Sequence, residues 1–300
     1  MSDTKHVELF EQVELFKQYL VDVRRVSPNT VSSYIRDVKQ LVAFLCNHGK
    51  SAFSDVSEVD LRMYITNLES NGRSSSTISR CIASLKVFFN RLAQEGYLLH
   101  NPISSIMSVA AAKKPPRLLN DQEIECLLNL PKISDPKGCR DKAMLETLYA
   151  TGIRVSELIS LDITDINIAT GLITCRNGKE RIVPVYESAI KAINLYLTST
   201  RANMASSSEM ALFVNTNGKR LSRQGLWKIL KNYAKEARID DDITPQTLRN
   251  SFAAHLLENG ADLESLQEML GHADISSTKV YARAVKNNLK DVYNKAHPKA

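Results

Sequence analysis

The sequence predicts a mainly α-helical protein with one small antiparallel β-sheet or hairpin, divided into two domains. Three observations support this fold class. Apolar residues recur at spacings of three and four along most of the 300 residues, as in amphipathic helices. One stretch, residues 171–185, instead has β-rich runs on either side of Asn177-Gly178, a dipeptide typical of hairpin turns. A basic segment with two consecutive prolines, residues 110–117, interrupts the helical pattern and predicts a linker.

Residues 1–109 are expected to form a helical bundle. Ser27 precedes Pro28, which is the arrangement of an N-cap followed by a proline at the first helical position. Ser57 is the expected N-cap of a later helix. The predicted helices cover residues 7–24, 28–47, 59–68 and 74–96. Amphipathic helices of this length predict a small bundle around one shared core.

Positively charged side chains recur on the last of these helices and in the linker. The candidates for contact with a phosphate backbone are Arg80, Lys86, Lys113, Lys114 and Arg117. On the helix they are either its solvated face or lie against phosphates, and the linker is either a solvated spacer or a basic strap along a phosphate backbone. The whole chain carries 39 Lys and Arg against 33 Asp and Glu, a net charge of +6 that by itself predicts little about partners.

Residues 118–300 are expected to be helical around the single hairpin. Asn120 or Asp121 is the predicted cap of the first helix, with Glu123 near its third position. Further helices are predicted over residues 140–152, 155–161, 186–199, 222–238, 245–260, 263–270 and from 276 onward. The second domain therefore combines many helices with one small sheet.

Composition argues against several classes of protein. No apolar run reaches the roughly 18 residues of a membrane-spanning helix. The N-terminal residues lack the apolar stretch of a secretory signal, so secretion is not expected. The five cysteines lie far apart without metal-ligand spacing, which predicts a reducing cytoplasm and neither a disulfide framework nor a zinc site.

Polar residues interrupt apolar helices in four strings of the second domain, at 150–158, 244–255, 270–274 and 276–281. Arg154 follows a glycine that ends one helix, so its guanidinium is expected near the next helix N-terminus, where an anion is favoured. The structural alternative is an ion pair with Glu157. Gln246 and Arg249 lie three residues apart on one helix face. The last two strings contribute His272 and Tyr281.

This set of side chains suits chemistry on a phosphodiester. Two guanidinium groups can hold the non-bridging oxygens and stabilise the charge added in the pentacoordinate transition state. A lysine or histidine can protonate the leaving 5′ oxygen, and a tyrosine can act as nucleophile when cations or a base assist it. The sequence shows no cluster of carboxylates, so a metal-dependent nuclease is not indicated.

The same strings, in their order and spacing, resemble the tyrosine site-specific recombinases, and most closely those of the Xer type. The resemblance is carried by Ala-Thr-Gly-Ile-Arg-Val-Ser-Glu-Leu at 150–158, Lys-Glu-Arg-Ile-Val-Pro at 179–184, Thr-Pro-Gln-Thr-Leu-Arg-Asn-Ser-Phe at 244–252, Leu-Gly-His-Ala-Asp-Ile-Ser-Ser-Thr at 270–278 and Val-Tyr at 280–281. It spans nearly the whole chain. It implies a helical core-binding (SAM-like) DNA-binding domain over residues 1–109 and a catalytic domain over residues 118–300, which form a C-shaped clamp around DNA.

The resemblance also implies a mechanism. Tyr281 attacks the scissile phosphate and leaves a 3′-phosphotyrosyl bond and a free 5′ hydroxyl, which then attacks the partner duplex through a Holliday junction. Arg154 and Arg249 hold the phosphate. His272 assists as a hydrogen-bond donor or acid/base, and Lys179 is the candidate acid for the leaving hydroxyl. Because the phosphotyrosyl bond keeps the energy of the broken ester, no metal, ATP or other cofactor is expected.

Two features depart from the usual pattern of this family. Gln246 and Asn250 each stand where histidine is usual. A glutamine can donate a hydrogen bond but cannot transfer a proton at neutral pH, so slower chemistry is expected. The hairpin is also shorter than usual, and the family's catalytic lysine maps to the gap. Lys179 is favoured over Arg176 because a titratable amine suits acid catalysis. His255 matches an ordinary histidine of the family and is expected to be structural.

The implied partner is double-stranded DNA with inverted half-sites, bound in a tetrameric synapse of identical or paralogous subunits, with a regulatory protein as a further candidate. After Tyr281, an apolar stripe of Val285, Leu289 and Val292 either packs on its own domain or is donated to a neighbouring protomer. A cytoplasmic location is expected, on the nucleoid when DNA is bound. Chromosome-dimer resolution and mobile-element resolution or integration both fit, and a catalytically weakened DNA-binding accessory protein is the alternative function.

Overall fold

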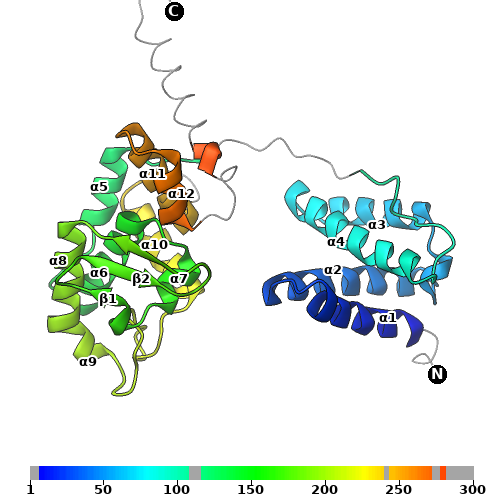
Figure 1. Cartoon of the computed structure of the whole chain (residues 1–300), viewed down its shortest axis with the longest axis horizontal. Coiled ribbons are helices and arrows are strands. Elements are labelled where there is room, and N and C mark those ends of the chain that lie inside the picture. The colour runs from blue at the N-terminus through cyan, green and yellow to red at the C-terminus, as the bar shows by residue number, and fades with distance from the viewer. Residues whose placement is uncertain (1–6, 108–115, 240–242, 272–277, 282–300) are drawn as a thin grey trace, which may run out of the picture. The chain divides into compact units, whose positions relative to one another are not determined.

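The computed structural model describes residues 7–107, 116–239, 243–271 and 278–281. The chain divides into two compact units, Met1–Lys113 and Lys114–Ala300 (Figure 1). The division falls within the basic segment 110–117. Arg117 belongs to the described part of this segment, whereas Lys113 and Lys114 do not. Each unit buries a hydrophobic core of its own.

In the described residues of the first unit, four α-helices surround a hydrophobic core of aliphatic and aromatic side chains. They are α1 (Val7–Gln18), which runs into a π-helical turn at Tyr19–Val23, α2 (Pro28–Asn47), α3 (Glu58–Ser70) and α4 (Ser75–Gln94). The side chains of Ser27, Ser57 and Ser74 cap α2, α3 and α4 by accepting a backbone hydrogen bond from the first turn. Phe53 and Phe88 meet edge to face in the core. The prediction of a helical bundle is confirmed.

The predicted β hairpin is confirmed, with one additional strand. β2 (Leu172–Cys175) and β3 (Arg181–Pro184) pair in antiparallel fashion, with Cys175 opposite Arg181. A short strand absent from the sequence prediction, β1 (Ile166–Asn167), pairs with the other edge of β2. The result is a small antiparallel sheet in an otherwise helical unit.

The hairpin turn is wider than the dipeptide Asn177-Gly178 predicts. Residues 176–180 connect the two strands, and Gly178 within them takes a positive φ of 104°. Lys179 therefore lies in this connection and not on the second strand, where the sequence pattern placed it. The Asn177 amide donates a hydrogen bond to the Ser156 carbonyl at 3.2 Å, so the connection rests on the start of the helix after residue 154.

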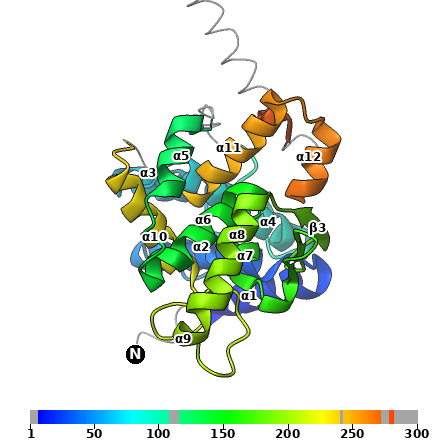
Figure 2. The same ribbon diagram turned by 90° about the vertical axis from the view of Figure 1, so that its left-hand side faces the viewer.

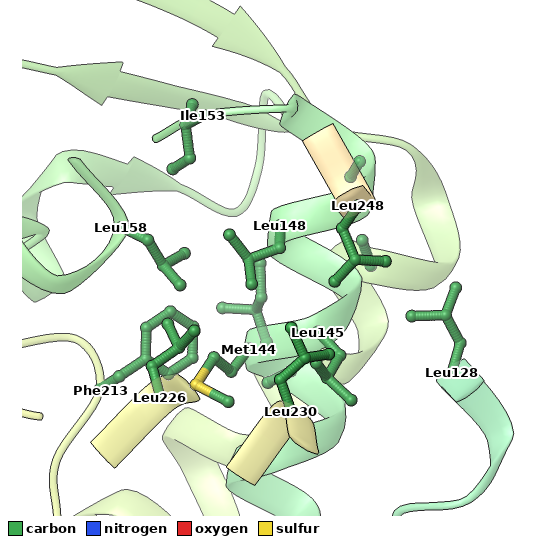
Figure 3. Close-up of a cluster of buried hydrophobic side chains, with 14 of the residues drawn as sticks. Leu128, Met144, Leu145, Leu148, Ile153, Leu158, Phe213, Leu226, Leu230 and Leu248 are labelled. Carbon is green, nitrogen blue, oxygen red and sulfur yellow. The ribbon is translucent and has the colours of Figure 1, made fainter. Parts of the chain in front are cut away.

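The second unit is built around α6 (Pro136–Thr151), which is buried along nearly its whole length. A helix with so little exposed surface must be enclosed by other elements, and α8 (Glu187–Leu195) and α11 (Pro245–Glu258) pack against it (Figure 2). Figure 3 shows the side chains of Met144 and Leu148 from α6 within the resulting core. The other helices are α5 (Asp121–Asn129), α7 (Val155–Ser160), α9 (Ala202–Met204), α10 (Arg223–Glu236) and α12 (Leu263–Leu270).

Candidate active site

Arg154 lies at the junction of α6 and α7. Gly152 ends α6 with a φ of 57°, and a Cβ at this position would lie 2.2 Å from the Phe252 ring, so both backbone conformation and space require glycine. Arg154 is then the N-cap residue of α7. Its guanidinium bonds Glu157 at 3.1 Å and the Gly271 carbonyl at 2.9 Å. The predicted ion pair with Glu157 is present, yet the Arg154 side chain stays 40% exposed and accessible to a ligand.

Arg249 projects from α11 into the same region and is only 3% exposed. Its guanidinium donates hydrogen bonds to the carbonyls of Gly152, at 2.5 Å, and Leu270, at 2.8 Å. Burial, reinforced by the positive charge of Arg154, lowers the pKa of Arg249 to about 10, while Tyr281 opposes this shift. The Arg249 guanidinium therefore remains protonated at neutral pH, and it lies near both Arg154 and Tyr281.

A third arginine, Arg181, is the residue that sequence reasoning missed. Its side chain on β3 and that of Glu157 on α7 are 4% and 1% exposed and form a two-point ion pair, with N–O distances of 2.8 and 3.1 Å. Burial raises the pKa of Glu157, but the hydrogen bonds from Arg181 and the Arg154 backbone outweigh it and hold that pKa below its ordinary value. A signal existed: Arg181 shares the inward face of its strand with Val183, and a buried arginine requires a carboxylate partner.

The three arginines meet at the C-terminal end of α12. Successive carbonyls of Met269, Leu270 and Gly271 accept hydrogen bonds from Arg181, Arg249 and Arg154, at 2.6, 2.8 and 2.9 Å. A helix C-terminus carries unpaired carbonyls and partial negative charge, so it suits three cations. His272 follows directly in the sequence and lies outside the described residues. The hydrogen bond from Arg154 thus holds Gly271, the residue directly before the predicted catalytic histidine.

Tyr281 is buried at 5% exposure and packs in a cluster with Phe252 and Leu266 of α11 and α12. The described structure therefore places the predicted nucleophile in the same region as Arg249, whose pKa it influences. The charged groups Arg154, Arg181, Arg249 and Glu157 sum to +2, because three positive charges meet one negative charge. A surplus of this sign attracts an anion.

The two cations proposed for the hairpin differ in their surroundings. Arg176 forms an ion pair with Asp165, whose side chain is 8% exposed. Lys179 is exposed, and its amine has no hydrogen bond or ion pair with any residue in the described ranges. Its backbone carbonyl accepts a weak bond from Arg181 at 3.4 Å. The amine of Lys179 is therefore available to a substrate, whereas the guanidinium of Arg176 is engaged.

The remaining candidates lie in different settings. Gln246, at the start of α11, is exposed and donates a hydrogen bond to Asn250 at 2.8 Å. His255 lies two turns further along α11, where its Nδ1 and the Tyr149 hydroxyl are 2.9 Å apart, which agrees with a structural role. No group of three His, Cys, Asp or Glu in the described ranges is arranged to hold a metal ion. In the same residues, no helix is both long and apolar enough to cross a membrane.

The DNA-binding candidates of the first unit are partly engaged within the protein. Arg80 pairs with the buried carboxylate of Asp37, which also accepts a bond from Ser84 at 2.9 Å, so this arginine braces α4 against α2. Lys86 is half-buried. In the second unit, Arg117 pairs with Glu123 at 2.9 Å. Contact of these side chains with DNA stays a prediction.

Comparison of the sequence with known families and relatives, and of the fold with solved structures, leads in both cases to integrases and recombinases. The chain matches the phage integrase family over residues 117–288 and the N-terminal SAM-like domain of phage integrases over residues 13–96. It is 44% identical over 293 residues to the tyrosine recombinase XerD of Oceanobacillus iheyensis, covering 96% of this chain and 98% of that protein. The tyrosine recombinase XerD of Listeria monocytogenes is 41% identical, with 96% and 99% covered. The structure of XerH recombinase bound to palindromic difH substrate matches with a TM-score of 0.74 at 20% identity, covering 97% of this chain and 90% of that one, a likeness of fold alone.

Proposed function

The chain belongs to the phage integrase family and is a site-specific DNA recombinase of the tyrosine type, and we propose that Arg154, Arg249 and Tyr281 form its reaction centre. The observation that carries this assignment is their convergence. Arg154, the N-cap of α7, and Arg249 of α11 bond adjacent carbonyls at the C-terminal end of α12, and Tyr281 packs against α11 and α12 beside them. DNA is the partner of the enzyme. Nothing in the comparisons favours the alternative of a weakened accessory protein.

The net charge of the site fits the reaction. A phosphodiester carries one negative charge, and attack by a tyrosinate adds a second in the pentacoordinate transition state. The surplus of +2 from Arg154, Arg181, Arg249 and Glu157 matches the transition state better than the substrate, which is the condition for catalysis by electrostatic stabilisation. Guanidinium groups also present paired donors to two phosphate oxygens.

In the proposed cleavage step, the Tyr281 oxygen forms a bond to phosphorus as the bond between phosphorus and the 5′ oxygen breaks. The leaving oxygen takes a proton, which we assign to the Lys179 amine because that amine is exposed and its loop is bonded to the start of α7 through Asn177. His272 is assigned as hydrogen-bond donor to the phosphate or as acid/base, and as acid/base it takes the proton that the Tyr281 hydroxyl loses on attack. One phosphate ester replaces another, so rejoining through the free 5′ hydroxyl and a Holliday junction needs no external energy source.

We assign DNA binding to the domain of residues 1–109, with Arg80 and Lys86 as its candidate phosphate contacts, and to the linker, with Lys113, Lys114 and Arg117 as further candidates. Residues 118–300 are assigned the chemistry, and a clamp of the two parts around the duplex belongs to the same proposal. The support is the match of the SAM-like family domain to residues 13–96 and of the integrase family to residues 117–288. Association should fall steeply with salt, because phosphate contacts release counterions.

A synapse of identical or paralogous subunits is proposed for strand exchange. The second unit has a mainly apolar cavity of about 430 Å³ beside α11, lined among others by Tyr149, Phe252 and Leu256. We propose that the stripe of Val285, Leu289 and Val292 from a neighbouring subunit occupies it. Such docking on α11, which carries Arg249, would couple neighbouring reaction centres. A regulatory protein and association with the nucleoid belong to the same proposal.

Two biological roles fit this activity, chromosome-dimer resolution and resolution or integration of a mobile element. They are separated by a deletion strain. Unresolved chromosome dimers and filamentous cells are expected for the first role, and an exchange site confined to a mobile element for the second.

The reaction centre is tested with a suicide substrate that is nicked beside the candidate cleavage site. The expected result is a protein–DNA band that resists denaturation and disappears in Tyr281→Phe. Salt-sensitive binding without a band, in the presence of any paralogous recombinase from the same source, would refute the assignment of chemistry and favour the accessory function.

A further inference from the structure

The two positions that depart from the usual recombinase pattern contact each other. Gln246 and Asn250 lie one helical turn apart on α11, and Gln246 Nε2 donates a hydrogen bond to Asn250 Oδ1 at 2.8 Å. Asn250 is 9% exposed, whereas Gln246 is exposed. The buried Asn250 amide therefore holds the exposed Gln246 amide in place, and the two residues that replace the usual histidines form one interacting pair.

This hydrogen bond uses only one of the two N–H groups of the Gln246 amide. The other has no partner among the residues that the structure describes. Arg249 stands three residues after Gln246, on the same side of α11, and its guanidinium belongs to the proposed phosphate site. The spacing places a donor on Gln246 on the same side of α11 as the phosphate site proposed at Arg249.

We propose that Asn250 is a positioning residue, which holds the Gln246 amide so that its second N–H donates to a non-bridging oxygen of the phosphate at Arg249. The inference rests on the proposed reaction centre. An exposed glutamine has several rotatable bonds, and ordering them during the reaction costs entropy. Because Asn250 orders the amide beforehand, Gln246 supplies a fixed neutral donor where a histidine would supply a charged one.

The proposal requires that Asn250 acts through Gln246. The effects of the two truncations on the cleavage rate must then be strongly non-additive, since Asn250 has nothing to position once Gln246 is absent. A purely structural asparagine would instead slow cleavage equally with and without Gln246. A double-mutant cycle therefore separates the two roles.

The experiment measures single-turnover formation of the covalent complex on the nicked substrate. Gln246→Ala is expected to slow cleavage by about 100-fold, as for loss of one transition-state donor. Asn250→Ala should slow it by about tenfold in the native chain, roughly the loss of one hydrogen bond, and by less than about twofold in the Gln246→Ala background. Asn232→Ala, which removes an exposed asparagine of α10, is the matched control and should leave the rate unchanged.

Unfolding monitored by the fluorescence of Trp227, the single tryptophan, shows whether a variant is folded. If Asn250→Ala lowers the unfolding midpoint, Asn250→Leu gives the same comparison while filling the space. Equal losses in both backgrounds, or no loss from Asn250→Ala, would overturn the positioning role while leaving the reaction centre intact. A native chain without any covalent complex would refute the reaction centre, and the inference with it.

Discussion

Arg181 is expected to be the largest single electrostatic contribution to the stability of the second unit. Replacing it with Met keeps much of the side-chain volume but removes two hydrogen bonds to Glu157 and one to the Met269 carbonyl. Loss of one partner from a buried ion pair costs about 3–5 kcal/mol. Arg154 keeps its bonds to Glu157, so we expect a loss near the lower limit, about 3 kcal/mol.

The assay is urea unfolding followed by Trp227 fluorescence. Trp227 lies on α10, so its signal reports the second unit and not the first. For a slope of roughly 2 kcal/mol per molar urea, a loss of about 3 kcal/mol lowers the midpoint by about 1.5 M. The control is Lys191→Met, which removes the cation of an exposed ion pair. The side chains of Lys191 and its partner Glu187 are 73% and 81% exposed, so this variant should leave the midpoint unchanged.

A second variant separates loss of charge pairing from loss of packing. In Glu157→Gln with Arg181→Met, no uncompensated buried carboxylate remains, so this double variant should be more stable than Arg181→Met alone. The reasoning fails if Arg181→Met lowers stability by less than about 1 kcal/mol, or if the double variant is the weaker of the two.

Three further predictions follow from the same geometry. The pKa of Glu157 is lower in the folded chain than its ordinary value of 4.5. The ionised carboxylate therefore contributes its full stabilisation above pH 4.5, and this stabilisation is lost as the pH falls through the lower, folded-state pKa. Acid unfolding of the second unit should show this pH-dependent loss, and Glu157→Gln should abolish the pH dependence. Gly152→Ala should destabilise the same unit by about 2–3 kcal/mol in urea unfolding, because its φ is positive and its Cβ would overlap Phe252; a midpoint like that of the native chain would contradict this. Lys179→Ala should slow cleavage by about 100-fold or more. A substrate with sulfur in place of the leaving 5′ oxygen should restore the rate of this variant, since a thiolate leaves without a proton. Arg176→Ala should cleave the ordinary oxygen substrate without needing the sulfur substitution.

The sequence by itself determined the local elements. Ser27 and Ser57 cap their helices as expected, because an N-cap bond joins a side chain to a backbone group only three residues away. The hairpin follows from Asn177-Gly178 between two β-rich runs. The family resemblance also came from short strings, and the comparisons bear it out over nearly the full chain.

Only the tertiary structure decided which charges meet. Arg181 and Glu157 are 24 residues apart in sequence, and Arg181 and Met269 are 88 apart, so no helical or strand period links them. Arg80 was a candidate for DNA contact, but in the structure it pairs with the buried carboxylate of Asp37, which lies 43 residues earlier in the sequence. Local periodicity says which side of an element is buried. The partner across the core depends on how whole elements pack, and in this protein that packing places three arginines at the end of α12.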